Sequence, residues 1–275
     1  MPNSAPEPTE EGSAEAVRPR RKGIYVLPNA VTLAALFAGF YAIVMAMNSR
    51  FDAAAIGIFC AAVLDGLDGR IARMTNTQSA FGEQMDSLCD MVSFGLAPAL
   101  IVYEWALKGL GKIGWIVAFI YCAGAALRLA RFNTNIGTVD KRFFQGLPSP
   151  AAAALVVGLI LVMEDAGYRN AYKLDGLAWT AMGVTLFAGL TMVTNLPYYS
   201  FKVVGGRRTV PFAVIVAVAL GIAAVSVHPP IALFLLFCGY GVSGYAVYAY
   251  RKARGAPASV IATSTDEPDE RGLHQ

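Results

Sequence analysis

The sequence predicts an all-α membrane protein, a polytopic helix bundle with about eight transmembrane helices and an active site at its cytoplasmic end. Of the 275 residues, 56% are hydrophobic and only 15% are charged, and the mean hydropathy is +0.51. The apolar residues form continuous runs of about 20, the helical length that crosses a hydrocarbon layer of about 30 Å. Barrel strands would instead alternate polar with apolar residues. We therefore expect helices over residues 28–47, 52–72, 83–106, 113–134, 148–164, 176–195, 209–227 and 230–250.

The distribution of basic residues predicts the orientation. If the N-terminus is inside, sixteen Lys and Arg residues fall on the cytoplasmic side and five on the other, as the positive-inside rule requires. Both termini are then cytoplasmic, in a multi-pass protein of the cell membrane. Residues 1–22 are expected to be a disordered tail with a basic cluster next to the membrane, residues 23–252 the transmembrane domain, and residues 253–275 a second disordered tail.

The charge and the cysteines argue against other classes of protein. The formal net charge is only +3, and no nucleic-acid partner is expected. The four cysteines are far apart and each lies in an apolar run, so they indicate neither a disulfide framework nor a zinc site.

Four carboxylates interrupt the apolar pattern at the ends of the second and third expected helices. Asp65 and Asp68 are three residues apart, and Asp86 and Asp90 are four apart, so each pair shares one face of its helix. Clustered carboxylates at low dielectric repel one another unless a cation is present. Hard oxygen ligands at this density predict Mg²⁺ or a similar divalent ion, and two such ions are expected.

Glycines on the same faces strengthen this interpretation. Gly69 and Gly82 remove side-chain bulk where a neighbouring helix or a ligand would approach, and Ala72 continues the small surface. The acids could alternatively cap helix ends or pair with Arg70 and Arg73.

These residues resemble the signature of the CDP-alcohol phosphotransferase family. The signature is Asp, two residues, Asp-Gly, two residues, Ala-Arg, eight residues, Gly, three residues, Asp, three residues, Asp. It is matched without a departure by Asp65, Asp68, Gly69, Ala72, Arg73, Gly82, Asp86 and Asp90. The resemblance implies a two-metal site, with Mg²⁺ or Mn²⁺, that binds a CDP-linked lipid and releases CMP. It also implies that Asp65, Asp68 and Asp86 are metal ligands, while Asp90 completes the site and acts as the general base.

Five further stretches resemble the branch of this family that uses serine as acceptor: residues 27–32, 92–99, 128–133, 144–150 and 195–202. The resemblance implies transfer of the phosphatidyl group of CDP-diacylglycerol to the hydroxyl of L-serine, which gives phosphatidylserine. It also implies a homodimer. Glycerol 3-phosphate or an inositol phosphate as acceptor, and an intramembrane cation carrier, are the alternatives.

The substrate-binding residues are each open to a second interpretation. Arg73 could hold a phosphate or anchor its helix at the membrane surface. The resemblance suggests that the cytidine end lies near Asn29 and Thr32, which could also cap the first helix.

On the acceptor side, Arg128 and Arg131 could bind the serine carboxylate or the lipid phosphate, or could act as membrane anchors. Ser93 is expected to face the acceptor, or to bond to a carbonyl of its own helix.

Overall fold

The protein is an all-α polytopic membrane bundle. The computed structural model describes residues 26–75, 77, 79–134, 143–169, 171–199, 221 and 226–254. Its elements are α1 (Val26–Met47), α2 (Phe51–Met74), α3 (Ala80–Asp90), η2 (Met91–Leu96), α4 (Ala97–Trp105), η3 (Leu107–Leu110), α5 (Lys112–Thr134), β1 (Phe143–Gln145), α6 (Ser149–Asp165), η4 (Ala171–Lys173), α7 (Asp175–Val193), β2 (Pro197–Tyr199) and α9 (Pro229–Ala253).

Helices occupy seven of the eight predicted spans, and the other span, 209–227, lies almost wholly outside the described residues. Within the described residues, five helical stretches are long and apolar enough to cross a membrane: Pro28–Met47, Ala80–Trp105, Lys112–Thr134, Asp175–Val193 and Pro229–Ala253. Helix α6 has only 17 residues, and α2 carries the predicted site acids among its apolar residues. The predicted N-terminal tail, 1–22, also lies outside the described residues. So does the predicted C-terminal tail, 253–275, apart from Ala253, which ends α9, and Arg254.

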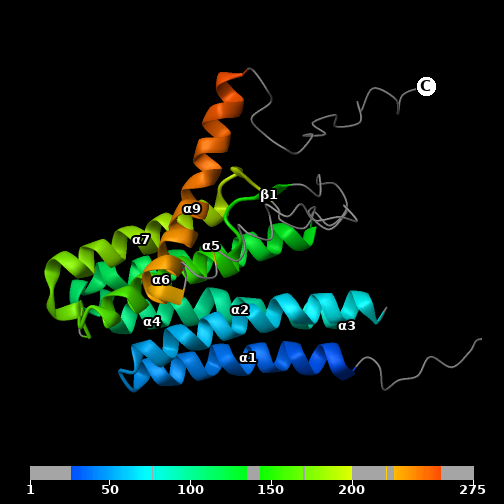
Figure 1. Cartoon of the computed structure of the whole chain (residues 1–275), viewed down its shortest axis with the longest axis horizontal. Helices are drawn as coiled ribbons and strands as arrows, with labels where there is room; N and C mark the ends of the chain where they lie inside the picture. Colours follow the sequence, from blue (N-terminus) through cyan, green and yellow to red (C-terminus); the bar gives the residue numbers. More distant parts are fainter. Residues whose placement is uncertain are drawn as a thin grey trace, which may run out of the picture.

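The helices pack around α6, the most deeply buried element. Every residue from Ala151 to Ile160 is buried, and many of these residues are alanines, which let neighbouring helices approach closely. Helix α1 packs along α2, α5 packs along α7, and α6 contacts α2, α7 and α9. Figure 1 shows α9 (orange) leaving the bundle at a steep angle to α1 and α2 (blue).

Two glycines allow the close approach of α5 and α7. A Cβ atom on Gly124 would lie 2.5 Å from the carbonyl oxygen of Gly189, and one on Gly189 would lie 2.9 Å from the Cα atom of Tyr121. Side chains at these positions would force the two backbones apart. The α5–α7 contact therefore depends on small residues, as membrane helix pairs commonly do.

A short two-stranded ribbon, which the sequence analysis did not anticipate, joins the segment before α6 to the segment after α7. Strands β1 and β2 are antiparallel, with Gln145 opposite Pro197. Gly146 follows β1 with a φ of +70°, and a Cβ atom there would lie 2.3 Å from the carbonyl oxygen of Met192. Glycine is therefore required at this turn.

A π-helical segment, η2, follows Asp90 directly and continues into α4. Pro98 has no N–H to donate to the carbonyl of Phe94, four residues earlier. The hydroxyl of Tyr121 on α5 donates to that carbonyl instead, at 3.0 Å. The irregular helix next to the site is thus tied to α5 by a fully buried tyrosine.

Candidate active site

The first two carboxylates lie near the C-terminal end of α2, beside α1. Asp68 is buried, with 5% of its surface exposed, and its Oδ2 atom accepts a hydrogen bond from the Thr32 hydroxyl at 2.7 Å. Thr32 is also buried, and its hydroxyl lies 3.1 Å from the carbonyl oxygen of Pro28. Helix α1 therefore fixes the orientation of the Asp68 carboxylate.

The other two carboxylates lie on α3, and Ser79 is the N-cap residue of this helix. The Ser79 side chain accepts a hydrogen bond from the backbone N–H of Gly82 at 3.0 Å, a typical N-cap interaction. From this start, Asp86 reaches the α2 acids: Asp65, Asp68 and Asp86 each offer an oxygen atom, and these atoms all lie within 4.8 Å of one another. Asp65 is also within side-chain hydrogen-bonding range of Asp90.

This donor set fits a divalent cation. Oxygen ligands at about 2.1 Å from Mg²⁺ can be no more than about 4.2 Å apart, so a small side-chain movement would bring the three acids into coordination. Arg70 and Arg73 form no ion pair with Asp68 or Asp86 within the described part of the chain. The predicted alternative of neutralisation by these arginines is therefore not seen for those two acids.

Arg128 on α5 supplies positive charge next to Asp90. The side chain is 9% exposed, and it lies close enough to Asp90 and Asp65 for its charge to act on both. Its Nη1 atom donates to the Ser149 hydroxyl at 2.8 Å, while its buried Nε atom has no hydrogen-bond partner among the described residues. A buried guanidinium N–H without a protein partner can donate to a ligand.

Small residues leave space beside the acids. A Cβ atom on Gly69 would have no neighbour within 4 Å, whereas one on Gly82 would lie 3.5 Å from the Asn29 side-chain oxygen. Asn29 and Gly82 are therefore neighbours across α1 and α3. Arg73, in the last turn of α2, is exposed, and Ala72 is partly buried.

Arg131 and Ser93 make protein contacts away from the carboxylates. The guanidinium of Arg131 donates to the carbonyl oxygens of Gln145, Met192, Val193 and Thr194 and to the Asn195 side chain, at 2.9–3.3 Å. It thereby caps the C-terminal end of α7 and joins it to β1. Ser93 is 1% exposed and contacts the Ala35 carbonyl of α1 at 3.4 Å, where Gly39 makes room for it. Their predicted contacts with the acceptor stay predictions.

Two contributors to the site were not singled out from the sequence. Ser149 accepts a hydrogen bond from Arg128. Asn133 donates at 3.1 Å to the hydroxyl of Ser87, which lies between Asp86 and Asp90 in the sequence of α3. Both residues lie in stretches that resemble the serine-using branch, so the likeness itself was the available signal.

Comparison with known proteins identifies the family. The family described as CDP-alcohol phosphatidyltransferase matches residues 25–193, more than half of the chain. The chain belongs to this family. The matched segment contains all four carboxylates together with Arg128 and Ser149.

Several curated relatives named CDP-diacylglycerol--serine O-phosphatidyltransferase share most of their length with this chain. The protein of Helicobacter pylori strain J99 is 37% identical over 80% of this chain and 90% of its own length. That of Methanocaldococcus jannaschii is 33% identical over 81% of this chain and 95% of its own length. That of Mycobacterium bovis is 32% identical over 81% and 79%, respectively.

Cation binding tests the carboxylate cluster directly. We expect Asp86→Asn to weaken Mn²⁺ binding at least tenfold, because one charged ligand is lost from a set of three. Binding is measured by electron paramagnetic resonance of free Mn²⁺ with the purified protein. Asp52→Asn is the matched control, since Asp52 lies on α2 thirteen residues before Asp65. Equal weakening in both variants, or no saturable binding in the wild-type protein, would contradict the assignment.

Proposed function

We propose that this protein transfers the phosphatidyl group of CDP-diacylglycerol to the hydroxyl of L-serine, giving phosphatidylserine and CMP. The main support is the convergence of carboxylates from α2 and α3 beside a buried arginine. These carboxylates belong to a complete family signature. The names of the relatives supply the donor and the acceptor.

The reaction requires a base and a way to stabilise phosphate charge. The serine oxygen attacks the lipid-side phosphorus, the bond from phosphorus to the bridging oxygen breaks, and CMP leaves. Asp90 accepts the hydroxyl proton in this proposal, since a positioned carboxylate can act as a general base. The positive charge of Arg128 lies next to this carboxylate, which also faces the negative charges of Asp65 and Asp86.

Two divalent ions, Mg²⁺ or Mn²⁺, are proposed as cofactors. Asp65, Asp68 and Asp86 would hold them, with Asp90 completing the site, and the bound cations would neutralise charge on the pyrophosphate oxygens. Thr32 keeps the Asp68 carboxylate oriented through its 2.7 Å hydrogen bond. Partners of metal-binding carboxylates of this kind are important for metal affinity.

We place the CDP end of the donor beside α1 and the end of α2. Gly69 leaves open space there, and Asn29 lies next to Gly82, so a nucleotide could approach the backbone closely. Ala72 continues this small surface, and the exposed guanidinium of Arg73 could bind a phosphate. Thr32 lies next to the same region, because its hydroxyl donates a hydrogen bond to Asp68.

For the acceptor we favour Arg128 as the residue that binds the serine carboxylate. Its Nε atom is buried without a hydrogen-bond partner among the described residues, and its Nη1 atom is held by Ser149. A carboxylate bound there would lie beside Asp90, which receives the serine proton. Both Nη atoms of Arg131 donate to carbonyl oxygens of α7 and β1 or to Asn195, and in this proposal the residue supports the site without touching serine.

We further propose that the protein resides in the cell membrane with both termini in the cytoplasm. The sixteen-to-five distribution of basic residues supports this orientation. It places the carboxylates on the side where serine is available. A homodimer is proposed from the family resemblance.

An acceptor screen tests the proposed reaction. Purified protein with Mg²⁺ or Mn²⁺ and CDP-diacylglycerol should release CMP when serine is added, and much less with glycerol 3-phosphate or an inositol phosphate. The latter acceptors carry a phosphate, for which a single buried Arg128 offers little neutralising charge. Release of CMP with another acceptor but not with serine would reassign the substrate.

Metal uptake into sealed vesicles without any CDP lipid would favour the carrier alternative.

Substitution of Asp90 tests its role as the base. Asp90→Asn should retain Mn²⁺ and nucleotide binding while turnover falls about 10²- to 10⁴-fold, the usual contribution of general-base catalysis. Glu83→Gln is the control, because Glu83 is an exposed acid on the same helix. A wild-type rate in Asp90→Asn would remove Asp90 from this role.

Substitution of Arg128 and of Arg131, both on α5, distinguishes a residue that binds the acceptor from one that supports the fold. We expect Arg128→Gln to raise KM for serine about tenfold or more, with a smaller effect on KM for CDP-diacylglycerol, because a charge-assisted hydrogen bond is lost. Arg131→Gln should lower the thermal unfolding midpoint, since several carbonyls lose their donor, with KM for serine little changed. An unchanged serine KM in a folded Arg128→Gln protein would refute the contact.

A further inference from the structure

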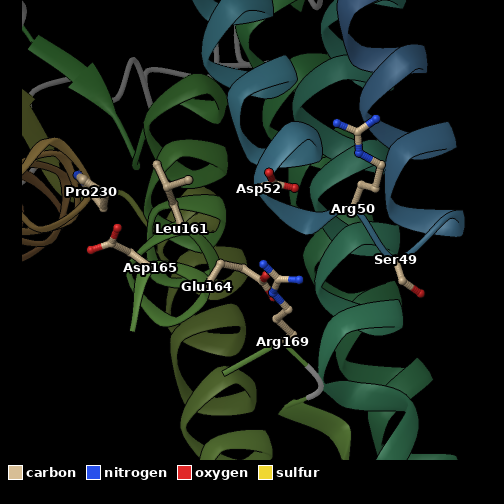
Figure 2. Close-up of a pocket in the computed structure, with 8 residues that line it drawn as sticks. All are labelled: Ser49, Arg50, Asp52, Leu161, Glu164, Asp165, Arg169 and Pro230. Atoms are coloured by element: carbon tan, nitrogen blue, oxygen red, sulfur yellow. The ribbon is translucent and has the colours of Figure 1, made fainter. Parts of the chain in front are cut away.

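A second polar hollow lies at the opposite end of α2 from the carboxylate cluster. Its volume is about 350 Å³, within the usual range for small-ligand pockets. Figure 2 shows that its walls come from the α1–α2 turn, the C-terminal end of α6, the loop after α6 and the start of α9. Asp52, in its wall, precedes Asp65 by thirteen helical residues, or about 20 Å. The hollow is therefore separate from the active site.

Charged residues of both signs line this hollow. Arg50 and Arg169 contribute positive charge, and Asp52, Glu164 and Asp165 contribute negative charge. None of these five side chains forms an ion pair with another residue in the described part of the chain. Opposite charges around one hollow that do not pair with each other leave room for a ligand that carries both charges.

One wall of the hollow is held by a buried tryptophan. The indole N–H of Trp105, which is fully buried at the end of α4, donates to Glu164 Oε1 at 3.1 Å. Glu164 is therefore oriented from inside the bundle and is only partly exposed. The same contact makes Trp105 a natural optical reporter of binding.

The hollow lies where three helices end, a position that favours the headgroup layer of a membrane. Helix α1 ends at Met47, α2 begins at Phe51, and α6 ends at Asp165, so three helix ends meet around it. Met47, Val227 and Ile231 expose apolar side chains close by in the sequence to the lining residues Ser49 and Pro230. A ligand with a charged head and acyl chains matches this combination of surfaces.

We propose that this hollow binds the headgroup of a phospholipid that carries a phosphodiester and a primary ammonium. The two arginines suit the anionic phosphate oxygens. An ammonium group has three N–H donors, and the hollow offers three carboxylates to accept them. A trimethylammonium headgroup has the same charge but no donor, and a glycerol headgroup has no positive charge, so both should bind less well.

The test uses Trp105 as the only tryptophan of the full-length protein. Trp115→Phe and Trp179→Phe remove the other two tryptophans, both about half exposed. Detergent-solubilised protein is titrated with short-chain phosphatidylethanolamine, phosphatidylcholine or phosphatidylglycerol, and free phosphoethanolamine distinguishes a lipid from its soluble headgroup. We expect a saturable fluorescence change and a raised thermal midpoint with phosphatidylethanolamine, at least tenfold tighter than with the other lipids. Native mass spectrometry then counts the retained lipid.

Variants place the binding event in the hollow. Arg169→Gln should weaken phosphatidylethanolamine binding about tenfold or more, while Lys112→Gln, an exposed cation outside the hollow, should not. Asp86→Asn should bind this lipid normally, which separates the result from the catalytic proposal. Equal binding of all three lipids, a response to Mg²⁺ or Ca²⁺ alone, or neither a fluorescence change nor a retained lipid would overturn the proposal.

Discussion

The main constraint on this structure is that it must hold several carboxylates close together, against their mutual repulsion, where water is scarce. Three acids offer oxygen atoms within 4.8 Å of one another, and Asp90 lies beside them. Such a cluster is unfavourable by itself, because each charge is partly desolvated and faces charges of the same sign. Two surrounding residues partly offset this repulsion. Thr32 on α1 donates a hydrogen bond to Asp68, and Arg128 on α5 brings positive charge next to Asp90. Four helices, α1, α2, α3 and α5, must therefore be in place before the acids can be held in this geometry.

The irregular helix after Asp90 follows from the same requirement. Helix α3 has to present two acids to α2 and then continue as α4 into the apolar core. The π-helical turn of η2, with Pro98 soon after it, makes that change of direction, and Tyr121 compensates the carbonyl that Pro98 leaves without an N–H. Local irregularity next to the site is stabilised by a hydrogen bond from a helix that also carries Arg128.

The helices and the acids were predictable from sequence because both depend on local patterns. Apolar runs set the helices, and spacing by three or four residues placed each pair of acids on one face. Ser93 shows the limit of this reasoning. Regular periodicity puts it on the face of Asp90, but η2 is not a regular α-helix, and the side chain packs against α1. The partners of Arg131 could not be predicted either, because they lie up to 64 residues away and are mostly backbone carbonyls.

Hydrogen bonds connect several of the stretches that resemble the serine-using branch. Arg131 joins residues 128–133 to Gln145 and Asn195, Arg128 joins the same stretch to Ser149, and Asn133 joins it to Ser87 between the acids of α3. Thr32 connects residues 27–32 to Asp68. Residues far apart in sequence are thus connected in two places: one set of hydrogen bonds joins α5 to α3, β1, α6 and the end of α7, and a separate one joins α1 to Asp68. A substitution in one stretch would therefore disturb its partners, and in the proposed reaction Arg128 is the member of this network that lies next to Asp90.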